Sequence, residues 1–227
     1  MKPVADLQPN TYAFETTALV KPTGFREYDA RWWFGHPGSD KPPEINLLGI
    51  QALGMGLGTL IRRLGAGPRI VVGHDFRSYS LGIKLALTQG LMAAGAQVKD
   101  IGLAVTPMAY FAQFALDVPS VAMVTASHNE NGWTGVKMGC ERPLTFGPDE
   151  MGKLREIVLS GDFDLPGGGG YERIEGFRER YIDDLAEGHR IERKLKVVAA
   201  CGNGTAAAFA PQLLEKIGCE VIPLDEI

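Results

Sequence analysis

The fold of this chain is decided by residues 69–101, which read RIVVGHDFRSYSLGIKLALTQGLMAAGAQVKDI. The run Arg69–Gly73 is rich in β-branched residues and ends in glycine, which predicts a buried strand. Leu81–Ala94 is expected to be a helix that Gly95 stops, and Gln97–Ile101 a second strand. A strand, a helix and a strand in this order predict parallel strands in an α/β layer fold.

The alternation of helices and strands continues on both sides of this unit. An earlier helix is expected at Ile45–Leu64, and its glycines, which are unfavourable in a helix, predict close packing. Downstream, the pattern predicts a helix at Pro107–Ala115, a strand at Val121–Val124 and a helix at Met151–Leu159. Residues 1–24 have no clear periodicity and are interpreted as an arm. We therefore predict an α/β fold with a mixed, mainly parallel sheet flanked by helices.

A glycine-rich segment separates a second unit from the first. Four consecutive glycines, residues 167–170, are typical of a linker or hairpin tip near a domain boundary. The pattern after them predicts a helix at Ile174–Gly188, a strand at Leu195–Ala200, a helix ending near Ile217 and a strand at Glu220–Leu224. Two strands do not make a domain. We expect a first domain at 1–172 and, at 173–227, the start of a similar second domain that is cut short.

Composition narrows the class of protein. The 227 residues are 45% hydrophobic and 22% charged, which is ordinary for a globular protein with a real core. The net charge of −4 gives no basic field, so neither nucleic acid nor a membrane is an expected partner. Cys140, Cys201 and Cys219 are scattered without CxxC spacing, which argues against a disulfide framework and a zinc site. With no apolar leader and no run of eighteen apolar residues, a cytoplasmic protein is expected.

Polar groups follow three of the predicted strands, where open α/β sheets bind their ligands. These segments are residues 73–78, residues 106–107 and residues 125–129. Ser127 lies at the exit of the apolar strand, after the small residue Ala126 and before His128 and Asn129, so backbone N–H groups beside the serine are expected to hold an anion. Ser127 and Glu130 also match a helix capping box. The glycines at 132 and 135 favour a structured loop instead, with Lys137 on its return arm.

These motifs resemble the α-D-phosphohexomutase family, in its phosphomannomutase/phosphoglucomutase branch. Thr125–Asn129, with Gly135-Val136-Lys137 downstream, is similar to the family's phosphoserine loop. Tyr28-Asp29-Ala30-Arg31 resembles its Tyr-Asp-x-Arg entry segment, and residues 72–78 resemble its Gly-x-Asp-x-Arg loop. The likeness runs over about residues 25–227, with Glu130 where the family usually has proline and Thr134 where it usually has asparagine.

The resemblance implies an intramolecular phosphotransferase of the isomerase class. Such an enzyme interconverts hexose 1-phosphate and hexose 6-phosphate through a phosphoserine, here Ser127, and a hexose 1,6-bisphosphate intermediate. Lys137 and His128 would be the general acid and base, and Arg31 would clamp the transferring phosphoryl group. Tyr28, Arg31 and Lys137 would bind the substrate. From the residues alone, Arg31 could equally pair with Asp29 or Glu27, and Asp75 and Arg77 are expected to form a supporting pair.

The resemblance also implies partners that this chain does not hold alone. The substrates would be glucose or mannose phosphates, with hexose 1,6-bisphosphate as activator. The cofactor would be Mg²⁺, bound to Ser127 through its phosphate, with the remaining ligands outside this chain, which has no Asp-x-Asp-x-Asp run. We therefore expect a partial enzyme in which residues 1–227 alone are inactive.

Two other functions fit parts of the sequence. Gly202, Gly204 and Ala207 fit a dinucleotide fingerprint between a strand and a helix, and Asp225 stands where a ribose-binding acid would sit. This interpretation leaves Ser127 and the three strand-end loops unexplained. A non-catalytic sugar-phosphate-binding protein would keep the fold, but it would not need Ser127, His128 and Lys137 together.

Overall fold

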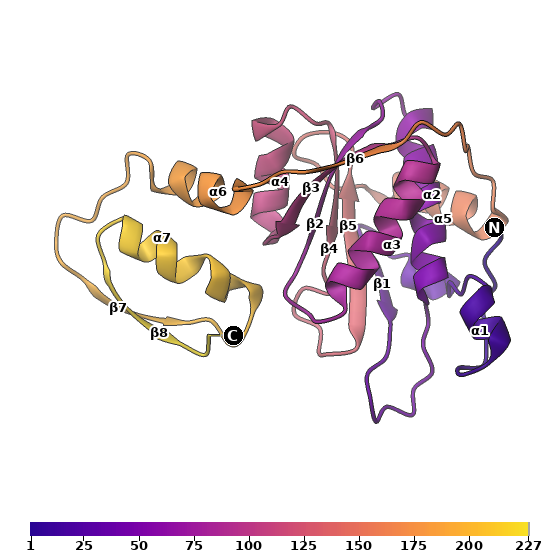
Figure 1. Cartoon of the computed structure of the whole chain (residues 1–227), viewed down its shortest axis with the longest axis horizontal. Coiled ribbons are helices and arrows are strands. Elements are labelled where there is room, and N and C mark those ends of the chain that lie inside the picture. Colours follow the sequence, from indigo (N-terminus) through magenta and orange to yellow (C-terminus); the bar gives the residue numbers. More distant parts are fainter. Residues whose placement is uncertain (227) are drawn as a thin grey trace.

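The computed structural model of the protein describes residues 1–226 (Figure 1). These residues form a six-stranded sheet in the order β1-β5-β4-β2-β3-β6 and a separate pair, β7-β8. The strands of the large sheet are β1 (Ala30–Trp33), β2 (Arg69–His74), β3 (Gln97–Leu103), β4 (Ser120–Val124), β5 (Trp133–Gly139) and β6 (Gly170–Arg173). β4, β2, β3 and β6 run parallel, and β5 is antiparallel to both β4 and β1. The predicted mixed, mainly parallel sheet is confirmed.

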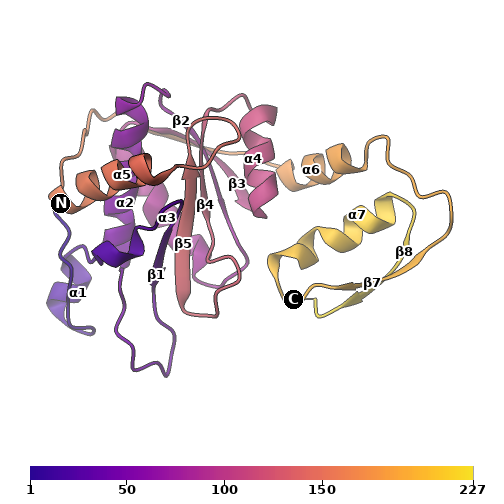
Figure 2. The ribbon, with the colours of Figure 1, turned by 180° about the vertical axis from the view of Figure 1, so that it is seen from behind.

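Helices cover both faces of the large sheet (Figures 1 and 2). One face carries α2 (Leu47–Arg63), α3 (Ser80–Ala93) and α5 (Pro148–Ser160), and the other carries α4 (Thr106–Ala115) and α6 (Phe177–Ala186). The alternation of strand side chains produces these two cores. Ile70 and Val72 of β2 pack under α2 and α3, whereas Val71 packs toward α4.

The glycines of α2 allow close contact with α3, as the sequence predicts. A Cβ atom on Gly54 would lie 2.2 Å from the carbonyl oxygen of Leu87. A Cβ atom on Gly90 of α3 would lie 2.0 Å from the carbonyl oxygen of Gln51. The two backbones therefore touch directly, and the packing accounts for residues that weaken an isolated helix.

The arm and the second unit complete the molecule. The arm contains α1 (Tyr12–Thr16) and the short 3₁₀ helix η1 (Pro22–Gly24). The second unit contains α6, β7 (Lys196–Ala200), η2 (Thr205–Ala208), α7 (Ala210–Lys216) and β8 (Glu220–Leu224), with β7 and β8 parallel. The division of the chain at 172/173 stays a prediction.

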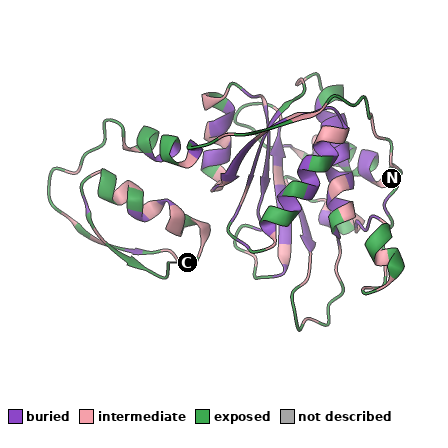
Figure 3. Cartoon of the chain, viewed as in Figure 1, coloured by how far each residue is buried: buried purple, intermediate pink, exposed green. Residues whose placement is uncertain are grey.

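Aromatic side chains join the second unit to the first. Phe111 of α4 has its ring centroid 5.9 Å from that of Phe177 and 5.3 Å from that of Tyr181, both on α6. Phe209 extends this cluster, 6.4 Å from Tyr181. By contrast, β7 and β8 are mostly exposed (Figure 3), including Val198 at 58%. None of the helices formed by residues 1–226 is long and apolar enough to cross a bilayer.

Candidate active site

The serine loop, residues 125–132, joins β4 to β5 at the lower edge of the sheet in Figure 1. Ser127 is exposed and has a left-handed backbone, with φ 57°. Its N–H donates to Thr125 Oγ1 at 2.9 Å. No helix begins in this segment, so the capping-box interpretation is wrong and the predicted structured loop is confirmed. The Asn131-Gly132 turn reverses the direction of the chain just before β5, so the segment is too short for a helical turn.

Arg31 lies on β1 opposite Gly135 and reaches under the serine loop. Its Nη1 donates to the carbonyl oxygen of Ala126 at 2.7 Å and to Oδ1 of Asn129. Its Nε and Nη2 donate to Asp29 Oδ2 at 3.0 and 2.8 Å. Arg31 therefore makes the ion pair with Asp29 that the sequence left open and, at the same time, holds the loop that carries Ser127.

Lys137 joins the same group from β5. Its side chain projects from the sheet face that also carries Arg31, and its Nζ lies 3.6 Å from Asp29 Oδ2. Asp29 thus links the arginine to the lysine. Sequence reasoning missed this role of Asp29, although its place in the Tyr28–Arg31 motif was a signal. The site has two cations and one carboxylate beneath the loop, which leaves one positive charge for an anion.

His128 and Tyr28 do not join this group. Both are exposed, and neither has a hydrogen bond to Arg31, Asp29 or Lys137 in the described part of the chain. A hydrogen bond with Glu27, and the charge of that carboxylate, raise the pKa of the Tyr28 hydroxyl. The structure therefore brings Arg31 and Lys137 together near Ser127, while the roles of His128 and Tyr28 stay predictions.

Residues 75–80, after β2, support the loop from a second side. Arg77 pairs with Asp75 through Nη1, which confirms the predicted supporting pair. Its Nη2 donates to the carbonyl oxygens of Asn129 at 2.6 Å and of Ser127 at 3.3 Å. The hydroxyl of Tyr79 accepts from the N–H of Gly132 and donates to the carbonyl of Trp133, both at 2.9 Å. Tyr79 gave no signal in the sequence.

A buried ion pair lies under α3, near this edge. Lys84 and Asp100 are each 1% exposed, and Lys84 Nζ donates to the two carboxylate oxygens at 2.8 and 2.6 Å. Asp100 also accepts from the Gly102 N–H and the Tyr171 hydroxyl. Burial opposes the charge of Asp100, but the hydrogen bond from Lys84 and the others outweigh it and lower the carboxyl pKa. The sequence gave no sign that Lys84 is buried.

Comparison with known proteins shows to which family this chain belongs. The family model described as phosphoglucomutase/phosphomannomutase, alpha/beta/alpha domain I, matches residues 23–165. The chain belongs to this family. The matched range contains Arg31, the segment 75–80, Ser127 and Lys137, so Ser127 and the residues that hold its loop lie within it. Gly202–Ala207 lie outside the matched range, and family membership accounts for the strand-end loops that the dinucleotide interpretation leaves unexplained.

Relatives of this family member are considerably longer than the chain. A phosphomannomutase/phosphoglucomutase of Pseudomonas aeruginosa PAO1 is 36% identical over 157 residues, which are 69% of this chain and 33% of the relative. A protein named probable phosphoglucosamine mutase in Thermococcus gammatolerans is 35% identical over 185 residues, 81% of this chain and 39% of the relative. The chain thus spans about a third to two fifths of these curated relatives.

A solved structure agrees with the fold. A phosphoglucomutase/phosphomannomutase family protein of Burkholderia thailandensis matches with a TM-score of 0.81 and 30% identity. The match covers 92% of this chain and 45% of that protein. It therefore includes most of the second unit, and the predicted phosphohexomutase fold is confirmed.

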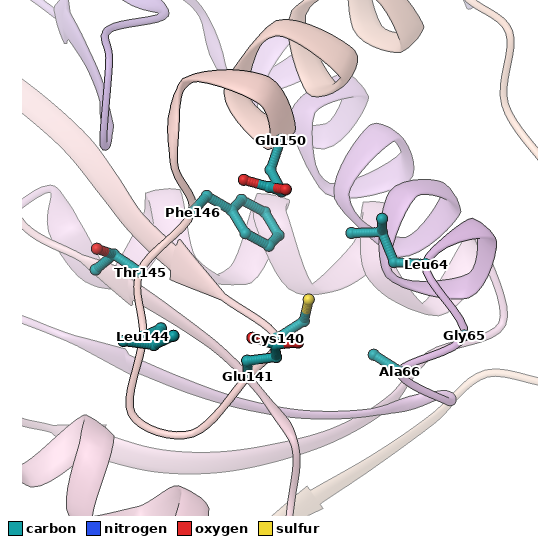
Figure 4. A pocket seen from close by; sticks show the side chains of 9 residues that line it. All are labelled: Leu64, Gly65, Ala66, Cys140, Glu141, Leu144, Thr145, Phe146 and Glu150. Carbon is teal, nitrogen blue, oxygen red and sulfur yellow. The ribbon is translucent and has the colours of Figure 1, made fainter.

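A cavity of about 430 Å³ lies at the opposite end of β5 from the serine loop (Figure 4). Cys140, Glu141 and Glu150 line it together with apolar residues at the end of α2. Burial, and then the two carboxylates, raise the pKa of the Cys140 thiol. The cavity contains none of the residues that hold the serine loop. Among residues 1–226, no group of three or more His, Cys, Asp or Glu side chains could hold a metal ion.

Proposed function

We propose that this chain forms the phosphoserine part of a phosphohexomutase active site, with Ser127 as the residue that carries the phosphoryl group. The observation that supports this most strongly is the conformation of Ser127. It is exposed and left-handed, on a loop whose carbonyl groups are bound from below by two arginines. This arrangement, in a chain of the phosphoglucomutase/phosphomannomutase family, suits a serine that presents a dianion to a cleft.

The reaction proposed is phosphoryl transfer between Ser127 and a hexose phosphate. The bond between phosphorus and Ser127 Oγ breaks, and a bond between phosphorus and a free sugar hydroxyl forms. The sugar hydroxyl loses its proton, and Ser127 Oγ gains one. The hexose 1,6-bisphosphate then turns over, and its other phosphate returns to Ser127. Hexose 1-phosphate and hexose 6-phosphate are thereby interconverted.

The residues around Ser127 have separate roles in this proposal. Lys137 and His128 are the acid and base candidates, and the ion pair of Lys137 with Asp29 would orient its amino group. Arg31 stabilises the charge of the transferring group, and Tyr28 contacts the substrate from its exposed position. The names of the relatives favour hexose phosphates, glucose or mannose phosphate, as substrates.

A divalent metal is part of the proposal, with Mg²⁺ as the ion. It would neutralise charge on the transferring phosphoryl group. One oxygen of the phosphate on Ser127 is the proposed ligand. Residues 1–226 do not fit a magnesium site by themselves, because they contain no cluster of carboxylates for it.

Mapping of the phosphate tests the proposal. Full-length protein is incubated with glucose 1,6-bisphosphate and Mg²⁺, and its phosphopeptides are identified by mass spectrometry. We expect phosphate on Ser127 and none on a Ser127→Ala variant. Phosphate on another residue, with Ser127 bare, would refute the proposal. Binding of the sugar phosphate without covalent transfer would favour the non-catalytic binding protein.

A further inference from the structure

Two arginine side chains bind three of the carbonyl groups of the serine loop. Arg31 binds the carbonyl oxygen of Ala126, and Arg77 binds those of Ser127 and Asn129. Three carbonyl groups within four residues therefore point toward guanidinium groups. Hydrogen bonds from a charged donor are stronger than those between neutral groups, so these three carbonyl groups are firmly held.

Arg77 is itself fixed by residues of its own turn. Asp75 Oδ2 accepts from Arg77 Nη1, and Asp75 Oδ1 accepts from the Arg77 N–H at 3.2 Å. The hydroxyl of Ser80 donates to Asp75 Oδ1 at 2.6 Å. Arg77 is 8% exposed and Asp75 is 4% exposed. The buried guanidinium of Arg77 binds a carboxylate through one nitrogen and two carbonyl groups through another, so it has little freedom to move toward a substrate.

The backbone at Ser127 needs such support. A left-handed conformation is unfavourable for a residue with a Cβ atom, and Ser127 adopts it at φ 57°. Arg77 binds the carbonyl group of this same residue, and it binds that of Asn129 more closely. The arginine therefore stabilises the strained conformation directly rather than through the sheet.

Several backbone donors of the loop are available to an anion. Within the described residues, the N–H groups of His128, Glu130 and Asn131 have no protein acceptor. These N–H groups are therefore backbone donors close to Ser127 that are left without a protein partner. Free N–H groups along a left-handed turn are suited to the oxygens of a phosphate.

We propose that Arg77, held by Asp75, is a positioning residue that keeps Ser127 in its left-handed conformation and does not itself bind the phosphate. The catalytic consequence of this role rests on the proposed function, whereas its structural consequence does not. Loss of Arg77 would free the carbonyl groups of Ser127 and Asn129, and the phosphoryl group would no longer be aligned with the acceptor hydroxyl.

The experiment uses Arg77→Met and Arg77→Lys, with Arg63→Met as the matched control. Arg63 also binds two acceptors, Asp162 and Asp164, but it lies on the surface at the C-terminal end of α2. The first measurement is amide hydrogen exchange across residues 125–132 in the chain of 227 residues. We expect faster exchange in this loop for Arg77→Met, unchanged exchange in β2 and β4, and no change for the control.

The second measurement is the steady-state kinetics of the full-length enzyme with glucose 1-phosphate. Misplacement of a reacting group by about 1 Å can lower the rate about 10²-fold, and we expect a loss of this size in kcat for Arg77→Met with little change in KM. Arg77→Lys keeps the charge but cannot reach Asp75 and both carbonyls, so kcat should fall in it too. If Arg77→Met does not fold, Arg77→Lys is compared with the wild type in both the hydrogen-exchange and the kinetic measurement.

The outcomes separate the positioning role from the proposed function. Unchanged loop exchange in a folded Arg77 variant would overturn the positioning role. So would a large rise in KM at constant kcat, because that result would mean that Arg77 binds substrate. If wild-type protein never takes phosphate at Ser127, the proposed function fails, and the exchange measurement still decides the role of Arg77.

Discussion

Arg31 has a wider role than a single contact with phosphate would require. It joins Asp29, the carbonyl of Ala126 and the side chain of Asn129. The sequence predicted that Arg31 belongs to the site, but not that it binds the loop. The partners at 126 and 129 are almost a hundred residues away in the chain, and only the pairing of β1 with β5 brings them together.

We expect Arg31→Ala to lower kcat of the full-length enzyme by about 10²-fold, as the loss of one charge-stabilising donor does in other active sites. Coupled assays with glucose 1-phosphate measure the effect. Arg69→Ala is the control, because Arg69 pairs at 3.8 Å with Asp117 at the other end of the sheet. An unchanged kcat in Arg31→Ala would exclude Arg31 from catalysis.

We expect His74 to make the stability of the folded protein depend on pH. Burial lowers the pKa of its imidazole below the ordinary 6.5, and its Nδ1 lies 2.8 Å from the carbonyl oxygen of Asp75. As the pH falls below about 6.5, the unfolded chain binds a proton before the folded chain does. The free energy of unfolding should therefore fall with pH in this range, by about 1.4 kcal/mol for each unit between the two pKa values.

Urea unfolding at pH 7.5 and pH 5.5 tests this expectation. The loss of stability on acidification should be smaller in His74→Asn than in the wild type, since the variant has no imidazole to protonate. His36→Asn, at an exposed position, is the control. Equal losses in the wild type and in His74→Asn would contradict the expected contribution of His74.

At the scale of the elements, most of the fold could be predicted from the sequence. Helices α2 to α6 and the parallel strands β2, β3 and β4 lie within a few residues of their predicted bounds, because their periodicity is local. The short helix α1 was not predicted, and the single helix expected before Ile217 is divided into η2 and α7. β1 and β5 could not be predicted in this way. A Cβ atom on Gly135 would lie 2.4 Å from the carbonyl oxygen of Ala30, so β5 needs glycine where strand propensity argues against it.

β6 was also missed, for a related reason. Gly170 belongs to a glycine run that predicts a linker, yet it pairs with Gln97 at the edge of the sheet. A Cβ atom on Gly170 would lie 2.2 Å from Oε1 of Gln97. The strand is therefore defined by its contacts with β3, which a local sequence pattern does not reveal.

The ion pair of Lys84 with Asp100 connects three elements, because Asp100 of β3 also binds Tyr171 and Arg173 of β6. Removing Lys84 would leave the buried charge of Asp100 with Arg173, which is 43% exposed, as its paired cation. We expect Lys84→Met to lower the free energy of unfolding by about 3–5 kcal/mol.

Lys99→Met is the matched control. Lys99 also joins β3 to β6, through Glu172, but this pair is largely exposed, and its loss should cost about 0–1 kcal/mol. Denaturant unfolding of both variants gives the comparison. Equal effects in the two variants would show that burial of Lys84 does not matter for stability.

At the scale of the whole molecule, one part of the second unit packs against the first unit and another part is exposed. α6 buries Phe177, Tyr181 and Ile182 against α4, whereas residues 187–195 are largely exposed. We expect trypsin to cut first at Arg190, Arg193 or Lys194 and to leave a stable fragment that retains α6. Mass spectrometry of a time course identifies the cuts. Early cleavage inside α6, at Arg178 or Arg180, would mean that the aromatic contacts with α4 do not hold it.

We propose above that Ser127 carries a phosphoryl group that passes to the sugar. The most direct measurement is a single-turnover chase of full-length protein that has been phosphorylated with radiolabelled phosphate and freed from excess donor. On addition of glucose 6-phosphate and Mg²⁺, we expect label to leave Ser127 and to appear in glucose 1,6-bisphosphate, with none transferred by Ser127→Ala protein. Label that stays on Ser127, or that appears only as inorganic phosphate, would contradict it.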